Sequence, residues 1–235
     1  MHNPTILIEK NSNLEYLKKD NGAKKAIFML HGYGASMNDL AGLADVITTK
    51  ESYDWIFPNA PKSVDLGFAM QGRAWFPVNM QDLEQAMMSG THRSFEDKCP
   101  EEFKSALSLA KIFIESISKD YDEIIIGGFS QGAMVCSHLS GSGFKKQKGL
   151  ILFSGTLIAK DLLLDTLEGK KPVPFFQSHG KQDPVLNFAE SMKLFELLKL
   201  NRFQGEFIPF DGAHEIPQIV VNKVSEYINR LGQII

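Results

Sequence analysis

The residues with the clearest chemical meaning surround Ser130, in the run Gly128-Phe129-Ser130-Gln131-Gly132. A short β-branched stretch, Ile124-Ile125-Ile126, precedes this Gly-x-Ser-x-Gly pattern, and residues suited to a helix follow it. The serine is therefore predicted to lie where a strand turns sharply into a helix, with glycines two positions away to avoid a steric clash. There its hydroxyl would be exposed beside helix N-terminal N–H groups, which can stabilise an oxyanion. The pattern alone is weak evidence, because about one chain of this length in ten would contain it by chance.

A nucleophilic serine needs a histidine as its base and a carboxylate that orients this histidine. When the serine occupies such a turn, its partners conventionally follow in the order serine, acid, histidine. His138 lies two turns along the same predicted helix, directed away from the hydroxyl, and His179 precedes any acid suited to that order. His214 follows the last predicted strand on a loop that contains a glycine, and it is the predicted base.

Two aspartates compete for the role of the acid. Asp183 follows the preceding predicted strand, and Pro184 after it can begin a helix, so a helix N-cap is the alternative role for Asp183. Asp211 lies three residues before His214. We favour Asp183, because the acid usually comes from a different loop and there meets Nδ1 of the imidazole end-on.

A second glycine-spaced turn, His31-Gly32-Tyr33-Gly34, follows the apolar run 26–30. An oxyanion hole needs a backbone N–H from such a strand-to-helix loop. The same pattern is equally typical of an ordinary β-to-α turn. His31 itself fits a structural hydrogen-bonding role better than that of a base.

Length and composition favour one globular domain: the chain has 235 residues, of which 43% are hydrophobic and 23% charged. A net charge of −3 gives no support for a nucleic-acid partner, and no apolar run reaches the roughly 20 residues of a membrane span. Cys99 and Cys136 make no disulfide framework, and residues 1–4 carry no secretion signal. We therefore expect a soluble cytoplasmic protein, and no cluster typical of metal ligands is present in the sequence.

Strands and helices that alternate along the chain would position the chemical residues. Strands are predicted at 5–9, 26–30, 53–58, 122–128, 149–155, 173–178 and 205–210. Helices are predicted at 39–48, 100–119, 131–140 and 161–167, then up to about residue 200, and finally around 220–231. This alternation predicts an α/β fold with a mostly parallel central sheet covered by helices on both faces. In such sheets ligands bind beyond the carboxyl ends of the strands, where Ser130, Asp183 and His214 all lie.

Residues 62–98 form an insert without periodicity. It is rich in aromatic residues and methionine, namely Phe68, Met70, Trp75, Phe76, Met80, Met87 and Met88. Irregular segments of this length inside compact domains are usually lids, binding loops or disordered. Its apolar content favours contact with an apolar ligand or a membrane surface, although capping of the core is an equally good explanation.

Taken in order, these motifs make the chain resemble the phospholipase/carboxylesterase family of α/β-hydrolases, which includes acyl-protein thioesterases, lysophospholipases and small bacterial carboxylesterases. The resemblance covers nearly the whole chain. It rests on Leu30-His31-Gly32-Tyr33-Gly34-Ala35, Asn38-Asp39-Leu40, Phe57-Pro58-Asn59-Ala60-Pro61, Arg73-Ala74-Trp75-Phe76, the Ser130 motif, His179-Gly180 with Asp183-Pro184-Val185, and His214.

The resemblance implies that Ser130 is the nucleophile, Asp183 the orienting acid and His214 the base. It implies that the backbone amides of Tyr33 and Gln131 form the oxyanion hole. An apolar channel for the acyl chain is implied near three further residues, Trp75, Phe76 and Leu157. The family needs no metal or cofactor.

We therefore expect a single α/β-hydrolase domain over residues 1–235, with a flap at about 62–98, that acts as a serine carboxylesterase. It would hydrolyse carboxylic ester or thioester bonds of acyl substrates through an acyl-enzyme intermediate. The sequence does not choose among esters, thioesters and lysophospholipids, so an acyl-protein thioesterase or lysophospholipase is the alternative. A rival from another class is a non-catalytic lipid-binding protein on a hydrolase scaffold. Peripheral membrane contact through the flap is a further expectation, and some family members form homodimers.

Overall fold

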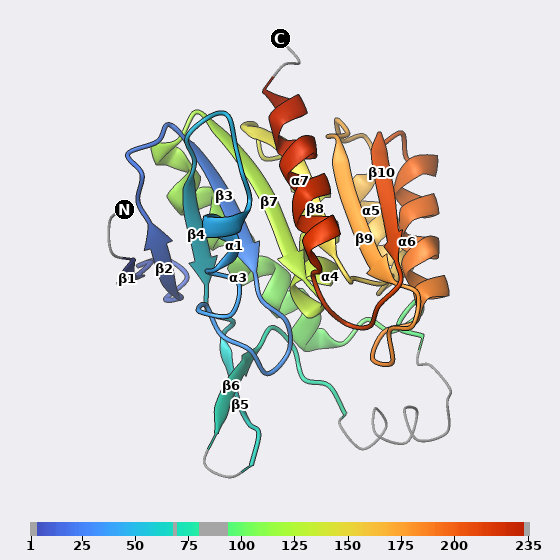
Figure 1. The fold of residues 1–235 in the computed structure, drawn as a ribbon. Coiled ribbons are helices and arrows are strands. Elements are labelled where there is room, and N and C mark those ends of the chain that lie inside the picture. Colours follow the sequence, from blue (N-terminus) through green and yellow to red (C-terminus); the bar gives the residue numbers. More distant parts are fainter. Residues whose placement is uncertain (1–3, 68–69, 80–93, 233–235) are drawn as a thin grey trace.

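The computed structural model describes residues 4–67, 70–79 and 94–232. Within them, an eight-stranded sheet has the strand order β1-β2-β4-β3-β7-β8-β9-β10 (Figure 1). The strands are β1 (Thr5–Ile8), β2 (Glu15–Lys19), β3 (Lys25–Leu30), β4 (Asp54–Pro58), β7 (Glu123–Phe129), β8 (Gln147–Phe153), β9 (Phe175–Gly180) and β10 (Gly205–Phe210). β2 pairs antiparallel with β1 and β4, and every pairing from β4 to β10 is parallel. The α/β fold with a mostly parallel sheet is therefore confirmed.

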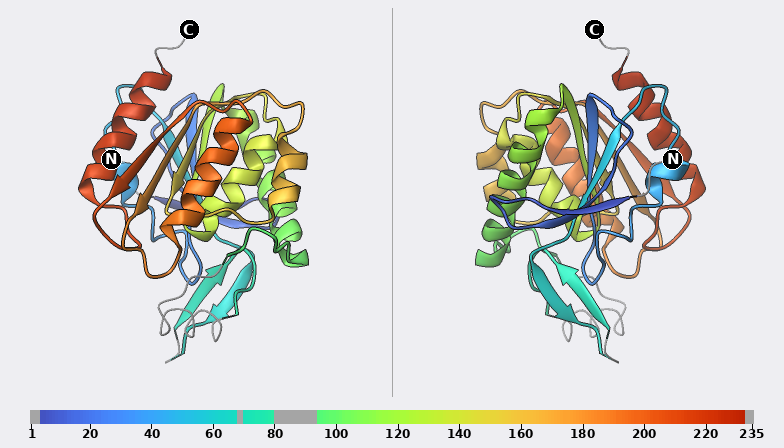
Figure 2. Two further views of the ribbon diagram at one scale, coloured as in Figure 1. Left: turned by 90° about the vertical axis from the view of Figure 1, so that its right-hand side faces the viewer. Right: turned by 90° about the vertical axis from the view of Figure 1, so that its left-hand side faces the viewer.

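Helices cover both faces of this sheet (Figures 1 and 2). One face carries α3 (Glu101–Ile117), α4 (Gln131–Leu139), α5 (Lys160–Leu167) and α6 (Phe188–Leu200), and the other carries α1 (Leu43–Val46) and α7 (Gln218–Leu231). Short 3-10 turns, η1 (Ser118–Asp120) and η2 (Ser140–Ser142), follow α3 and α4. Among the described residues, no helix is long and apolar enough to cross a bilayer.

The side chains of the central strands point alternately to the two faces of the sheet and form a separate hydrophobic core on each face. Ile124 and Ile126 of β7 join the core under α3 to α6, whereas Ile125 between them joins the core under α1 and α7. Side chains on successive strand residues point to opposite faces, so a strand covered on both sides must be apolar throughout. This requirement explains the continuous apolar runs in the sequence.

Two elements differ from the sequence-based prediction. β2 was not predicted, because three of the five residues in Glu15-Tyr16-Leu17-Lys18-Lys19 are charged and only the adjacent Tyr16 and Leu17 are buried, one in each core. The helix predicted at 39–48 is mostly a series of turns, and only Leu43–Val46 is helical. The exposed Gly42 before it weakens any longer helix.

The insert is more ordered at its beginning than its sequence suggested. β5 (Lys62–Asp65) and β6 (Gln71–Ala74) form an antiparallel hairpin that projects from the body of the molecule (Figures 1 and 2). The flap prediction also involved Phe68, Met80, Met87 and Met88, which lie outside the described residues.

Candidate active site

Ser130 occupies the sharp turn between β7 and α4. Its backbone angles are φ 56° and ψ −119°, a left-handed φ that is strained for a residue with a Cβ. A Cβ at Gly132 would lie 2.1 Å from the carbonyl oxygen of Leu30, and one at Gly128 would lie 2.5 Å from the backbone of Gly132. Only glycine therefore fits on either side, and the turn presents the serine at the N-cap of α4, which begins at Gln131.

Asp183 and His214 meet at the carboxyl ends of β9 and β10. Oδ2 of Asp183 accepts a hydrogen bond from Nδ1 of His214 at 2.6 Å. Oδ1 accepts from the backbone N–H groups of Val185 and Leu186 at 2.8 and 2.9 Å. Burial raises the pKa of Asp183, but the His214 hydrogen bond and charge and the Leu186 N–H outweigh burial and hold this pKa below its ordinary value. The carboxylate therefore stays ionised, fixes the proton on Nδ1 of the imidazole, and leaves Nε2 free to accept another proton.

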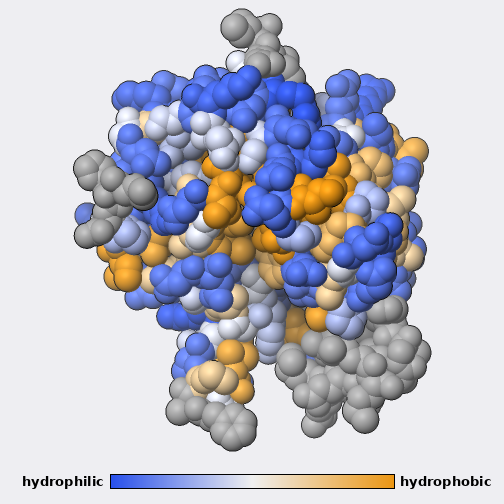
Figure 3. All heavy atoms as spheres, in the orientation of Figure 1, coloured by the Kyte–Doolittle hydropathy of each residue, from blue (hydrophilic) through white to orange (hydrophobic). Residues whose placement is uncertain are grey.

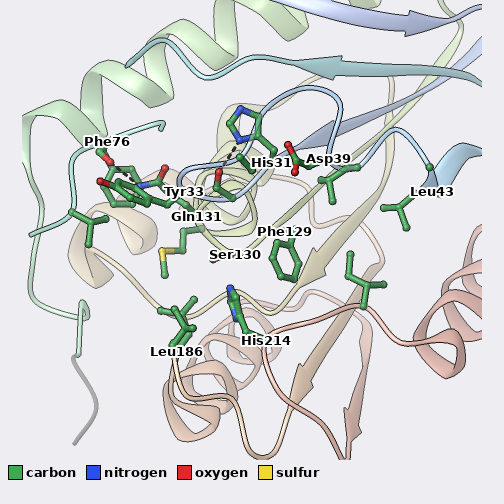
Figure 4. A pocket seen from close by; sticks show the side chains of 18 of the residues that line it. His31, Tyr33, Asp39, Leu43, Phe76, Phe129, Ser130, Gln131, Leu186 and His214 are labelled. Atoms are coloured by element: carbon green, nitrogen blue, oxygen red, sulfur yellow. Dashed lines mark hydrogen bonds between the residues drawn. The ribbon is translucent and has the colours of Figure 1, made fainter. Parts of the chain in front are cut away.

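Ser130 and His214 line the same cavity (Figure 4). The Phe129 ring, adjacent to the serine in sequence, packs against the imidazole with their centroids 4.7 Å apart. Asp211, the alternative acid, is instead directed outward, with its side chain 81% exposed and 2.9 Å from the ammonium of Lys181. The structure thus brings the predicted serine, histidine and first aspartate together and leaves Asp211 apart.

The other buried histidines have structural partners. Nε2 of His31 accepts from the Ala60 N–H at 3.0 Å, and its Nδ1 donates to the Gly32 carbonyl at 2.7 Å. Burial lowers the pKa of His31, so this ring is neutral and shapes the glycine-spaced loop. Nε2 of His138 lies 2.9 Å from the Ile158 carbonyl, and burial lowers the pKa of His138 to about 4.

His179 lies behind the carboxylate. Its Nε2 donates to the Leu186 carbonyl at 2.9 Å and lies 3.3 Å from Oδ2 of Asp183. Burial lowers the pKa of His179 too, and a neutral ring can make these contacts. The side chain therefore braces the loop that carries the acid.

The two amides predicted for the oxyanion hole belong to Tyr33 and Gln131. Neither donates to a carbonyl or side chain within the part of the chain that the structure describes. The Gln131 amide is in the first turn of α4, where N–H groups have no intrahelical partner. Both residues line the cavity that contains Ser130, so both are available to a ligand there.

The β5–β6 hairpin holds the Tyr33 loop in place. Gly34 N–H donates to the Arg73 carbonyl and Arg73 N–H donates to the Ala35 carbonyl, both at 2.8 Å. A Cβ at Gly72 would lie 2.2 Å from the Gly34 carbonyl oxygen, so this approach requires glycine. The first part of the insert therefore supports the loop that carries Tyr33.

Sequence reasoning missed the side chain of Gln131. Its Oε1 accepts from the Trp75 N–H and its Nε2 donates to the Phe76 carbonyl, both at 2.7 Å. The Trp75 indole in turn donates to the His31 carbonyl at 3.0 Å. These bonds join the serine turn to the end of the hairpin, and no sequence signal could have found them, since only the fold brings residues 56 apart in sequence together.

The cavity has a volume of about 760 Å³ and a mostly apolar wall. Phe76 lines it, as the resemblance implied. Trp75 and Leu157 are not among its lining residues, because both side chains are packed in the core at 0% and 1% exposure. Among the described residues, no group of histidine, cysteine or acidic side chains has the arrangement of a metal site.

The fold and this arrangement of serine, histidine and aspartate define an α/β serine hydrolase. The model of the phospholipase/carboxylesterase family matches residues 11–231, and the chain belongs to that family. It is therefore an enzyme that hydrolyses ester bonds of acyl substrates.

Relatives of known name share this assignment. Acyl-protein thioesterase 1 of Candida albicans is 29% identical over 227 residues, which are 90% of this chain and 94% of the relative. Its counterpart in Debaryomyces hansenii is 32% identical over 200 residues, 78% of this chain and 80% of the relative. Among solved structures, esterase PE8 has a TM-score of 0.72 at 23% identity and covers 97% of this chain and 98% of its own. Acyl-protein thioesterase 2 of Zea mays has a TM-score of 0.69 at 19% identity, with 92% and 98% covered. At these identities the two structures support the fold alone.

Proposed function

We propose that Ser130, His214 and Asp183 are the catalytic triad of this hydrolase, and that the amides of Tyr33 and Gln131 form its oxyanion hole. The observation that carries the proposal is the 2.6 Å contact between Asp183 and His214 at the wall of the cavity that also contains the strained Ser130 turn. An oriented imidazole that lines the same cavity as a serine hydroxyl is the arrangement that acyl transfer requires.

The reaction proceeds in two halves. Oγ of Ser130 attacks the acyl carbonyl carbon while its proton passes to Nε2 of His214, and the negative oxygen receives hydrogen bonds from the Tyr33 and Gln131 amides. The bond to the alcohol or thiol then breaks, and the leaving atom takes the proton from His214. In the second half, water attacks the carbonyl carbon of the acyl-enzyme and gives one proton to Nε2 of His214. His214 then returns this proton to Oγ of Ser130 as the carboxylic acid leaves.

The acyl group would occupy the side of the cavity that belongs to the core under α3 to α6. This acyl arm is lined by Phe76, Val78, Phe95, Met134, Val185 and Leu186. An apolar wall stabilises a hydrocarbon chain by removing it from water, at about 0.8 kcal/mol for each buried methylene. Thioesters of the same acyl groups pass through a similar tetrahedral intermediate, and the names of the fungal relatives support acyl-protein thioesters as substrates in addition to esters.

The proposal is tested by replacing the nucleophile. Ser130→Ala should retain the thermal unfolding midpoint of the wild type within a few degrees and lose hydrolysis of p-nitrophenyl butyrate and of an acyl thioester. Ser105→Ala, on the exposed face of α3, is the matched control and should keep full activity. Unchanged hydrolysis by purified Ser130→Ala would overturn the assignment.

Peripheral membrane contact is a finer part of the proposal and is supported by the hairpin tip. Leu66 and Met70 are 42% and 57% exposed there, on the part that projects furthest from the body (Figures 1 and 3). Trp75 cannot contribute, because its side chain is fully buried. Flotation with anionic lipid vesicles should recover wild type, and Leu66→Ser/Met70→Ser should float less. The control is Ile112→Ser/Leu164→Ser, which changes two exposed positions on α3 and α5. Equal flotation of all three proteins would contradict the proposed membrane contact.

A homodimer is supported by the outer strand β1. Ile6 and Ile8 are 60% and 59% exposed on this edge strand, where unpaired backbone groups can pair with a second copy. Sedimentation equilibrium should give twice the 26.3 kDa chain mass, and a Thr5→Pro variant should shift the mass towards one chain. A single-chain mass for wild type at micromolar concentration rules this out.

A further inference from the structure

The cavity extends from Ser130 to both faces of the sheet. Its acyl arm belongs to the core under α3 to α6, as defined above. A second group of lining residues belongs to the core under α1 and α7. This second group, here the α1 arm, consists of Leu40, Leu43, Phe129 and Ile216, together with Val46, which lines the cavity from the exposed side of α1 and is not part of that core. Since β7 separates the two cores and ends at the serine, the reacting carbonyl lies between two apolar surfaces.

The position of His214 indicates which part of the substrate enters the α1 arm. The leaving atom must take its proton from the imidazole, so the leaving group departs past that ring. Phe129 packs on the imidazole at 4.7 Å, and Ile216 follows His214 by two residues. Figure 4 shows Phe129 and Leu43 on one side of the His214–Ser130 pair, with Phe76 and Gln131 on the other.

We propose that the α1 arm is a binding site for the alcohol part of the ester, and that it selects uncharged, apolar alcohols. This inference rests on the proposed function of Ser130 and His214. An ester with hydrocarbon on both sides of its carbonyl would be removed from water along both arms, and this burial favours the bound state.

The charges around the cavity support an uncharged leaving group. Its described lining residues include no lysine or arginine. They do include Asp39, an exposed carboxylate whose Oδ2 accepts from the N–H and hydroxyl of Ser36. A phosphate on the leaving group would find no lysine or arginine among these described lining residues and would lie near the negative charge of Asp39. Neutral esters are therefore preferred over lysophospholipids, whose leaving group carries a phosphate.

The surface outside the α1 arm is also apolar. Val46 is 50% exposed on α1, and Ile219 is 56% exposed on α7. Figure 3 shows hydrophobic residues gathered in the region of α1 and the start of α7, surrounded by polar surface. A longer alcohol can therefore continue to gain apolar contact as it extends from the arm.

A two-way series of esters tests the inference on the wild-type enzyme. With butyrate as the acyl group, kcat/KM should rise by about two- to fourfold for each methylene added to the alcohol from methyl to hexyl. Lysophosphatidylcholine with a butyryl group should be cleaved at least tenfold less efficiently than hexyl butyrate. A flat response to alcohol length, together with a rise along an acyl series of methyl esters, contradicts the inference and leaves the proposed function intact. If no ester in either series is hydrolysed, the proposed function itself fails.

A matched pair of variants assigns the arms. In Val46→Asn, the ratio of kcat/KM for hexyl butyrate to that for methyl butyrate should fall by about three- to tenfold relative to wild type. Val78→Asn, in the acyl arm, should lower the corresponding ratio for methyl hexanoate over methyl butyrate and leave the alcohol ratio near its wild-type value. Ile112→Asn, 40% exposed on α3 outside the cavity, controls for general effects of the substitution. If Val46→Asn changes the acyl ratio and Val78→Asn the alcohol ratio, the assignment of the arms is reversed and the inference is wrong.

Discussion

At the scale of single residues, Asp183 uses its two oxygens for different tasks. Oδ1 is held by the N–H groups of Val185 and Leu186, so the carboxylate cannot rotate freely. Oδ2 is then fixed towards Nδ1 of His214 at 2.6 Å. Asp183 is not a helix N-cap, because α6 begins at Phe188 and is capped by Asn187. Its bonds to the N–H groups of the following loop instead orient the carboxylate towards the proposed base.

Replacing Asp183 tests this division. Asp183→Asn keeps an oxygen for the Val185 and Leu186 amides but can turn its NH2 towards His214, which favours the wrong imidazole tautomer. We expect kcat to fall by about 10⁴ with the fold retained, as judged by circular dichroism. Asp211→Asn removes the competing aspartate, which pairs with Lys181, and should stay within about twofold of wild type. Equal losses in the two variants would contradict the assigned acid.

His138 gives a prediction for stability against pH. Burial lowers its pKa from 6.5 to about 4, so between these values the unfolded chain binds a proton that the folded chain excludes. The free energy of unfolding therefore falls as the pH drops through this window, by about 3 kcal/mol in total from this residue.

Urea unfolding at pH 7, 6, 5 and 4.5 measures this dependence. His138→Gln retains a donor for the Ile158 carbonyl without a titrating group, so its stability at pH 7 should be lower but should change less across the window. His31 and His179, whose pKa values are also lowered by burial, account for part of the slope that remains. Identical slopes for wild type and variant would show that His138 is not the source.

At the scale of elements, the hairpin and the serine turn support each other. β6 pairs with the oxyanion loop through Arg73, and the Gln131 side chain binds the backbone of Trp75 and Phe76. Gln131 therefore contributes to the site in two ways. It lines the cavity with its backbone amide, which has no partner among the described residues, and its side chain holds the Trp75–Phe76 backbone in place. On the proposed mechanism, the hairpin would position the Tyr33 amide through its backbone bonds to Gly34 and Ala35.

Gly72→Ala tests the coupling between hairpin and oxyanion loop. The added Cβ would lie 2.2 Å from the Gly34 carbonyl oxygen, so the loop must shift and carry the Tyr33 amide with it. Loss of one oxyanion donor lowers kcat by about 10²–10³, and a partial displacement should cost on the order of tenfold to a hundredfold. The measurement is kcat for a p-nitrophenyl ester at saturating substrate.

Gly22→Ala provides the control for that variant. Gly22 has a φ of +65° and open space around it, so alanine there should cost about 1 kcal/mol of stability and no activity. If Gly72→Ala loses stability alone, as Gly22→Ala should, the hairpin does not position the oxyanion hole.

At the scale of the whole molecule, one sheet carries two cores and the site lies where they meet. Strand β7 contributes side chains to both cores and ends directly before Ser130, the proposed nucleophile. We propose that the chain acts as a single domain. Removing the helices from either face would expose the apolar side chains that the central strands direct to that face. A cavity with an apolar arm on each face follows from the same arrangement.

The sequence predicted the parts of this architecture that depend on local pattern. Continuous apolar runs located the central strands, and the Ser130 glycines located the nucleophile turn, because each requirement involves neighbouring residues. β2 was missed because its only apolar residues are the adjacent Tyr16 and Leu17, one on each face. The β5–β6 hairpin was missed because Lys62–Asp65 is mostly polar and exposed.

For the site, the order of serine, acid and histidine was sufficient to choose three residues now found at one edge of the sheet. Trp75 and Leu157 were placed near the acyl channel by resemblance, yet they pack in the core, and Phe76 lines the cavity. Which of two adjacent aromatic side chains faces the cavity depends on the path of the backbone, and Gln131 fixes that path through bonds that only the folded chain forms.

Covalent labelling tests the central claim most directly. The purified protein is treated with a fluorophosphonate, digested, and the modified peptides are identified by mass spectrometry. A catalytic Ser130, activated by His214 and supported by the oxyanion amides, predicts one adduct per chain, on the peptide that contains residue 130. An adduct on a different serine, or no adduct on a folded protein, would contradict the account and favour a binding protein that has the hydrolase fold without its reaction.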